Sequence, residues 1–198
     1  KGKGIPAEHG PLSPSMPGFS QEVKGFTYNP AKAKALLQEA GYPGGINLPE
    51  ITLQSSNNAT TVQVVEALQQ QWLKFGIKTV LRQVNFPEHS AMMHAGKLGF
   101  WRGNWIADYP DPENFFMLFY SKNLPREGAN YCRYQNAEYD RAFEQMSTMD
   151  NGPERLALIQ KMNALLAEDC PVIWQFDKVT MLAPQPWATW THNSRMIE

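Results

Sequence analysis

The spacing of apolar residues predicts helices that alternate with short strands in the first half of the chain. In one helix, Ala33, Leu36, Leu37 and Ala40 recur at the i, i+3, i+4, i+7 spacing of a single face. Strands separated by helices imply crossover connections, and therefore a mainly parallel or mixed sheet with helices packed on it. The predicted fold class is therefore α/β. The predicted order is helix, strand, helix, strand, helix and strand, at about 30–40, 51–54, 60–75, 77–84, 87–97 and 98–106.

The second half of the chain is predicted to be mainly helical. A short helix follows Pro112, and two longer helices are separated by Gly152 and Pro153. Strands are expected only near the end, and the proline-rich first 28 residues indicate an extended surface segment without a core of its own. The two longer helices are predicted at about 137–149 and 153–169, and the strands at 171–176 and 179–182.

Residues 100–116 combine aromatic side chains with charged ones in an unusual density. If residues 100–106 form a strand, the period of two places Phe100, Arg102, Asn104 and Ile106 on one side. Trp101, Gly103 and Trp105 then share the other side. Asp111 before Pro112 is a suitable helix cap. Arg102 and Asp108 lie six positions apart and require an opposite charge or water, and a ligand could supply that partner.

The net charge of the chain gives no electrostatic reason to expect nucleic acid or an anionic membrane as a partner. The 198 residues include 18 basic and 19 acidic side chains, for a net charge of −1. No segment approaches the ~18 consecutive apolar residues that span a bilayer. Cys132 and Cys170 lack metal-site spacing, so no metal is expected. Two buried free thiols are favoured, and a disulfide remains open in an oxidising compartment.

Four motifs in order along the chain carry a family resemblance. They are YNPAKAKALLQEAGYP at 28–43, WIADYPDPEN at 105–114, YCRYQNAEYD at 131–140, and the segment from ERLAL to CPVIW at 154–174. Together they resemble the extracytoplasmic oligopeptide- and dipeptide-binding proteins, the solute receptors of peptide ABC transporters. The resemblance implies a receptor with two lobes, of which this chain is the C-terminal part. Residues 1–183 would form most of the second, ligand-binding lobe, and residues 184–198 would begin the return to the first.

The resemblance also carries two functional residues over onto matching positions of this chain. Asp108 would hold the α-ammonium group of a peptide and Arg102 its carboxylate. The backbone from Asn104 to Ile106, with Trp105 between them, would add the peptide as a further strand. Trp101 and Trp105 could line side-chain pockets.

Each of these assignments has a structural alternative. Asp108 could cap the turn before Pro110. Arg102 could pair with Glu113 or another acid. One of the two tryptophans could belong to the core. Asn57, Asn58 and Thr60 follow a strand, where ligands often bind, but helix capping explains them equally well.

The resemblance implies a binding protein and not an enzyme. The alternatives are a hydrolase, for which no G-x-S-x-G or H-E-x-x-H motif is present, and a receptor of the same architecture for an oligosaccharide or a metal chelate. His89 and His94 lie about 140° apart around a helix, which makes them a poor ligand pair. We expect no cofactor, a monomer, short peptides and permease subunits as partners, and a periplasmic or extracytoplasmic location with or without a lipid anchor.

Overall fold

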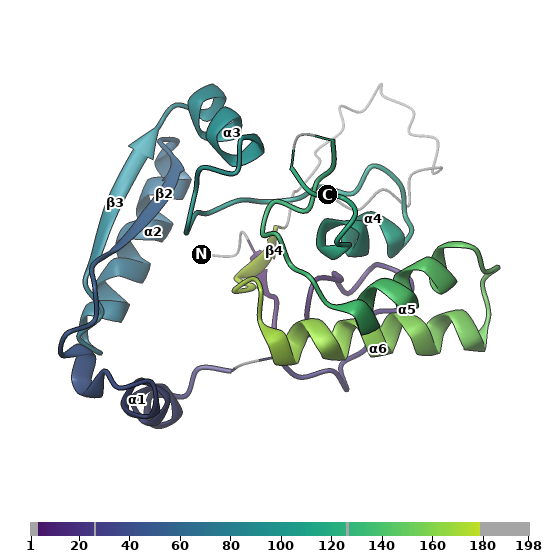
Figure 1. Ribbon diagram of the computed structural model, residues 1–198, viewed down its shortest axis with the longest axis horizontal. Helices are drawn as coiled ribbons and strands as arrows, with labels where there is room; N and C mark the ends of the chain where they lie inside the picture. Colours follow the sequence, from purple (N-terminus) through teal and green to yellow (C-terminus); the bar gives the residue numbers. More distant parts are fainter. Residues whose placement is uncertain (1–3, 26, 126, 179–198) are drawn as a thin grey trace, which may run out of the picture. The chain divides into compact units, whose positions relative to one another are not determined.

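The protein divides into two compact units, each of which is described by itself. Figure 1 shows the computed structural model, which describes residues 4–25, 27–125 and 127–178. The inserted unit is Tyr28–Asn104. The flanking unit is formed by Lys1–Thr27 together with Trp105–Glu198. Within the described ranges, no helix combines the length and the apolar character that a membrane crossing requires.

The inserted unit is built around a strand–helix–strand motif. Strands β2 and β3 are parallel, in register from Ile51 opposite Thr79 to Ser56 opposite Val84. Helix α2 connects them and packs on both, and Leu53 of β2 and Val65 of α2 are buried. The elements of this unit are α1 (Pro30–Glu39), η1 (Pro43–Gly45), β2 (Ile51–Ser56), α2 (Ala59–Leu73), β3 (Thr79–Val84) and α3 (Phe86–His94).

Asparagine caps begin the helices of the inserted unit, and Asn29 begins α1. Its side chain accepts a hydrogen bond from the backbone N–H of Lys32 at 2.9 Å. Asn58 accepts one from Thr61 at 2.9 Å, which confirms the capping interpretation for Asn58. After α2 the chain turns at Gly76, whose φ of 79° is left-handed, and a Cβ there would collide with the backbone of Gly44.

Replacing the Asn58 cap with alanine is expected to lower the free energy of unfolding by about 1 kcal/mol. The backbone N–H of Thr61 would lose its acceptor. Asn58→Asp keeps that acceptor and is the matched control. Hydrogen exchange of the first turn of α2 measures the effect, and equal protection in the two variants would contradict the capping role.

Helix α1 forms where it was predicted, but its predicted apolar face is only partly covered, with Ala33 and Leu37 half-buried. No residue of α1 is buried, and the Leu36 side chain is 47% exposed. The amphipathic spacing therefore identified the helix correctly, although none of its apolar side chains reaches a buried core.

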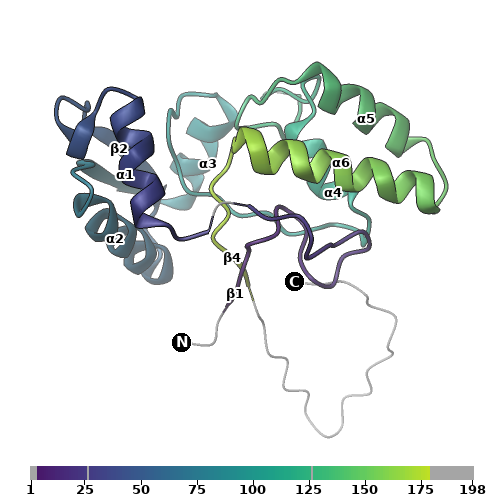
Figure 2. The same ribbon diagram turned by 90° about the horizontal axis from the view of Figure 1, so that it is seen from below.

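The flanking unit is a helical hairpin with its own core. Helices α5 and α6 lie side by side in both ribbon views, and short helical turns precede them (Figures 1 and 2). The Tyr139 hydroxyl, fully buried, donates to the Phe116 carbonyl at 2.7 Å. The elements are β1 (Gly4–Pro6), α4 (Glu113–Phe116), η2 (Met117–Phe119), α5 (Ala137–Ser147), α6 (Pro153–Asp169) and β4 (Phe176–Lys178).

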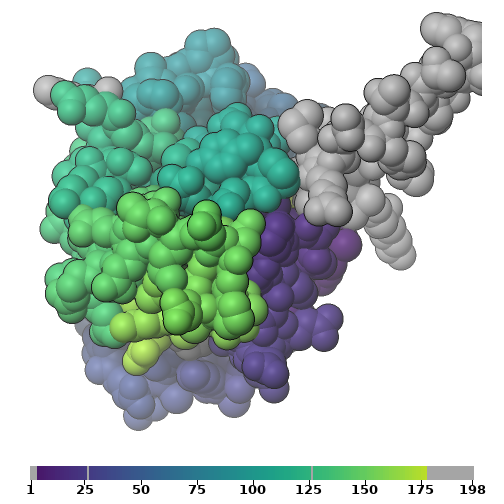
Figure 3. All heavy atoms as spheres, turned by 90° about the vertical axis from the view of Figure 1, so that its right-hand side faces the viewer, coloured from purple at the N-terminus to yellow at the C-terminus, as the bar shows by residue number. Residues whose placement is uncertain are grey.

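The N-terminal segment is part of this core, so the prediction of a surface segment was wrong. Leu12 and Met16 are 2% and 4% exposed and belong to the same apolar cluster as the helical hairpin. Figure 3 shows the segment in purple packed directly against the hairpin in green. Asn163 of α6 also donates to the His9 carbonyl at 3.0 Å. Prolines and glycines interrupt helices and strands, but they do not prevent the side chains between them from being buried.

The fold class is mixed helix and sheet, as predicted, but the strands form two separate pairs. Strand β1 pairs antiparallel with β4, while β2 pairs with β3. The strand predicted at 98–106 is reduced to one parallel bridge between Trp101 and Gln54. The strand predicted at 171–176 begins only at Phe176. The predicted strand at 179–182 and the return segment at 184–198 lie outside the described residues.

Candidate functional site

Asp108 lies in the flanking unit on a turn that is fixed by a buried asparagine. Asn114 of α4 has no exposed surface. Its side-chain oxygen accepts a hydrogen bond from the Trp105 indole N–H at 2.7 Å and a longer one from the Asp108 backbone N–H at 3.4 Å. One amide oxygen thus holds both ends of the segment from Trp105 to Asp108. The Asp108 side chain itself is exposed.

The next acid in this turn has a structural role. The Asp111 carboxylate accepts the backbone N–H of Glu113 at 2.9 Å, at the start of α4, although the N-cap position itself is Pro112 and not Asp111 as predicted. It also forms an ion pair at 2.7 Å with Arg155, whose side chain is 7% exposed. No described residue donates a hydrogen bond to the Asp108 carboxylate. The structure therefore separates the two acids by function, with Asp111 used for the fold and Asp108 exposed to solvent.

Arg102 lies in the inserted unit, where its backbone completes the bridge to β2. Its N–H donates to the Gln54 carbonyl at 2.9 Å, while the Gln54 N–H donates to the Phe100 carbonyl at 3.1 Å. The half-buried Arg102 guanidinium contacts the Thr61 hydroxyl at 3.4 Å. Burial lowers the pKa of Arg102 from its usual value, although arginine stays protonated in proteins.

The boundary between the units falls between Asn104 and Trp105. It therefore divides the six predicted site residues three and three. Both tryptophans are half-buried, and the side chains of Asn104 and Ile106 are exposed. The roles of the six residues toward a ligand stay predictions.

Two buried residues near this segment were not assigned to the site from sequence. Asn114 is one. The only sequence feature that could have indicated it is an amide side chain next to an aromatic run. His89 is the other. It is 3% exposed and its ring lies 6.3 Å from that of Trp101, whereas His94 is exposed. The two histidines therefore do not share an environment. Among the described residues, no cluster of three or more His, Cys, Asp or Glu side chains is placed to hold a metal ion.

Both cysteines are free, as favoured from sequence, and both are partly buried. Burial raises the pKa of the Cys132 thiol and of the Cys170 thiol. A raised pKa disfavours the reactive thiolate form. The two side chains therefore act as small apolar groups in the flanking unit.

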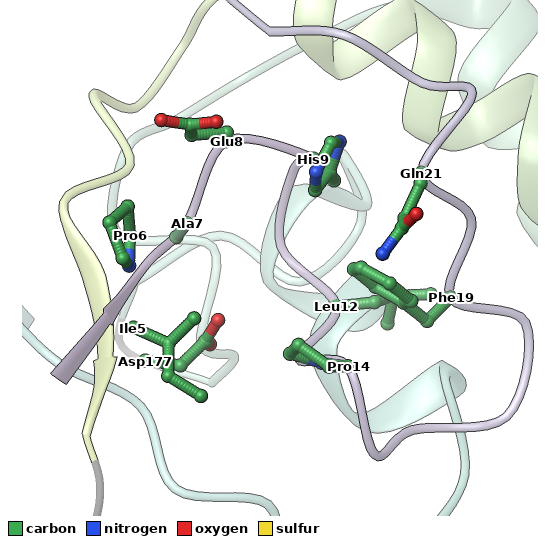
Figure 4. Close-up of a pocket in the computed structure, with 10 residues that line it drawn as sticks. All are labelled: Ile5, Pro6, Ala7, Glu8, His9, Leu12, Pro14, Phe19, Gln21 and Asp177. Carbon is green, nitrogen blue, oxygen red and sulfur yellow. The ribbon is translucent and has the colours of Figure 1, made fainter.

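A pocket of about 240 Å³ lies within the flanking unit, beside the N-terminal segment (Figure 4). Its volume is below the roughly 300–1,000 Å³ of typical small-molecule sites. Burial raises the pKa of the Asp177 carboxyl at its edge. None of the six predicted site residues lines it, so the pocket is separate from the predicted peptide contacts. The lining residues are Ile5, Pro6, Ala7, Glu8, His9, Leu12, Pro14, Phe19, Gln21 and Asp177.

Comparison with known proteins identifies the family. The model of the middle region of bacterial extracellular solute-binding proteins, family 5, matches residues 1–124, which is more than half of the chain. The chain belongs to this family. Its members are solute-binding proteins, and they are named for a location outside the cell membrane.

Individual relatives of this family-5 chain agree with that assignment. It is 26% identical over 175 residues to a dipeptide-binding protein of Escherichia coli, covering 87% of this chain and 32% of the relative. It is 28% identical over 177 residues to heme-binding protein A of Haemophilus influenzae, again covering 87% of this chain and 32% of the relative. The chain therefore spans about a third of the length of these curated relatives.

A solved structure supports the same fold. A periplasmic oligopeptide-binding protein from Borrelia burgdorferi superimposes with a TM-score of 0.78 and 24% identity. The match covers 87% of this chain and 34% of that structure. At this identity the likeness establishes the fold of the family-5 chain and not its ligand.

Proposed function

We propose that this chain is part of a two-lobed receptor that captures short peptides and delivers them to an ABC permease. The observation that carries the proposal is the exposed Asp108 carboxylate on a turn held by the fully buried Asn114. A carboxylate at a fixed position, exposed to solvent, suits a ligand ammonium group. The neighbouring Asp111, in contrast, is already paired with Arg155.

Arg102 supplies the complementary charge for the peptide carboxylate. Its guanidinium is half-buried, and partial loss of water strengthens an ion pair with a ligand that arrives there. Free termini are present in every unmodified short peptide, whatever its sequence. Charges at Asp108 and Arg102 therefore select for peptides without selecting among their side chains.

Main-chain hydrogen bonds supply the remaining sequence-independent contacts. In the bridge, the Arg102 N–H and the Phe100 carbonyl form hydrogen bonds to β2. Because backbone groups alternate along an extended chain, those of Trp101 and Gly103 point to the opposite edge. A peptide added at this edge and along Asn104 to Ile106 would pair by its backbone, while the half-buried Trp101 and Trp105 would line side-chain pockets.

The proposed receptor acts outside the cytoplasmic membrane, with or without a lipid anchor, as a monomer and without a cofactor. It binds its cargo and does not hydrolyse it. A peptide held between the two lobes would bind the closed form better than the open form and so shift the equilibrium toward closure. The permease subunits would then recognise the closed form. Residues 1–183 would provide most of the ligand-binding lobe, and residues 184–198 would return toward the other.

Calorimetric titration of the full-length receptor with di- to pentapeptides tests this proposal. Loss of a charge-assisted contact on N-acetylation is expected to weaken binding by about 10–100-fold. Mass spectrometry should recover the peptides intact. Equal binding of free and acetylated peptides would remove Asp108 from its role. No binding of any peptide would favour an oligosaccharide or a chelate such as haem, the ligand named for one relative.

A further inference from the structure

His89 lies next to the bridge to β2, and both of its ring nitrogens have hydrogen-bond partners. Nε2 lies 3.0 Å from the Arg102 carbonyl oxygen. Nδ1 lies 3.4 Å from the side-chain nitrogen of Gln54, which is itself 2% exposed. The helix α3, strand β2 and the segment that carries Arg102 therefore meet at one imidazole.

The partners fix the tautomer of this imidazole. A carbonyl oxygen only accepts, so Nε2 carries the hydrogen and donates it to Arg102. The Gln54 amide nitrogen only donates, so Nδ1 accepts from it. Both bonds are made when His89 is neutral with its proton on Nε2.

Both backbone groups of Arg102, its N–H and its carbonyl, thus have a hydrogen-bond partner. Gln54 binds the N–H at 2.9 Å, and His89 binds the carbonyl at 3.0 Å. We propose that His89 is a positioning residue that fixes the main chain at Arg102 and so orients the guanidinium for a peptide carboxylate. This inference rests on the proposed function and adds a residue, and a pH dependence, to it.

Protonation would disrupt this arrangement. A second N–H on Nδ1 would face the Gln54 side-chain donor, and this hydrogen bond would be lost. Strand β2 contributes no titratable residue to this contact. On α3 the neighbouring Glu88 is paired with Arg82 at 3.4 Å and both are exposed.

The direction of the pH effect follows from burial. Desolvation lowers the pKa of His89 below the usual value for histidine, and the bond to the Arg102 carbonyl opposes this only in part. His89 is therefore neutral at pH 7 and binds a proton only as the pH falls through its lowered pKa. The unfolded or loosened segment binds that proton more readily, so order at Arg102 is lost toward acid pH.

The test is peptide affinity of the full-length receptor between pH 7 and pH 5, for wild type, His89→Gln and His89→Leu. In this range a peptide keeps both terminal charges, since its ammonium and carboxyl pKa values are about 7.7–8.0 and 3.3–3.7. Wild-type affinity should fall toward acid pH, by at most about tenfold per pH unit. His89→Gln, which cannot titrate, should lose this slope.

Two further comparisons separate positioning from a general loss of structure. At pH 7, His89→Leu should lower the affinity for a peptide with a free carboxylate by about 3–10-fold. The affinity for a C-terminally amidated peptide should hardly change. His94→Gln, on the exposed side of the same helix, is the matched control and should keep the wild-type slope.

Parallel pH profiles for wild type and His89→Gln would overturn the positioning role while leaving peptide binding intact. An equal loss for free and amidated peptides in His89→Leu would overturn it as well. Absence of peptide binding by wild type at every pH would overturn the proposed function and this inference together. Because a leucine variant can fail to fold, the comparison of wild type with His89→Gln decides.

Discussion

Replacing Asp108 with asparagine is expected to lower the affinity of the full-length receptor for peptides with a free amino terminus by about 10–100-fold. The substitution keeps the size of the side chain and removes its charge. In the proposed complex the α-ammonium group would lose a charge-assisted hydrogen bond, which is about twice as strong as a neutral one. The turn should survive, because Asn114 holds it through the Asp108 backbone and Trp105.

Asp150→Asn is the matched control for this experiment. Asp150 is also exposed and lies in the flanking unit, and the change in net charge is the same. N-acetylated peptides give a second control, because without an ammonium group the wild type and Asp108→Asn should bind them equally. A loss no greater than that of Asp150→Asn would exclude Asp108 as the ammonium partner.

Helices and their caps could be predicted from sequence because their signals are local. Asn29 and Asn58 cap the helices that they precede, and α6 spans Pro153 to Asp169 as predicted. Each signal acts within one or two turns of the chain. The buried Ile159, Met162 and Leu166 lie three and four residues apart, which is the spacing of one helix face.

The strand at 98–106 and the buried N-terminal segment could not be predicted in the same way. A strand requires a partner, and β2 offers this segment one bridge at Gln54. Leu12 and Met16 are buried by helices more than a hundred residues away. Asn114 and His89 were missed for the same reason, because their roles depend on being buried, and burial is set by the tertiary fold. The sequence therefore indicated the charged residues Arg102 and Asp108 and missed the buried residues that hold their backbone.

Replacing Arg155 with methionine is expected to destabilise the flanking unit by about 2–4 kcal/mol. The buried guanidinium donates to the Met146 carbonyl at 3.2 Å, the Asn151 side chain at 2.8 Å and Asp111 at 2.7 Å. Methionine fills part of the volume but leaves all three acceptors without this donor. Asp111 is 30% exposed, so water recovers some of the loss, which is why the range begins below that of a fully buried pair.

Lys161→Met on the same helix is the control for Arg155→Met, because the Lys161–Glu138 pair is about half exposed and should contribute little. Urea unfolding of the full-length receptor, followed by hydrogen exchange in α5 and α6, measures both variants. Arg155→Met should also weaken peptide binding, since Asp111 anchors the turn that carries Asp108. Lost stability with unchanged affinity would show that Asn114 alone maintains the turn. Equal stability of the two variants would show that burial of Arg155 adds nothing to its ion pair.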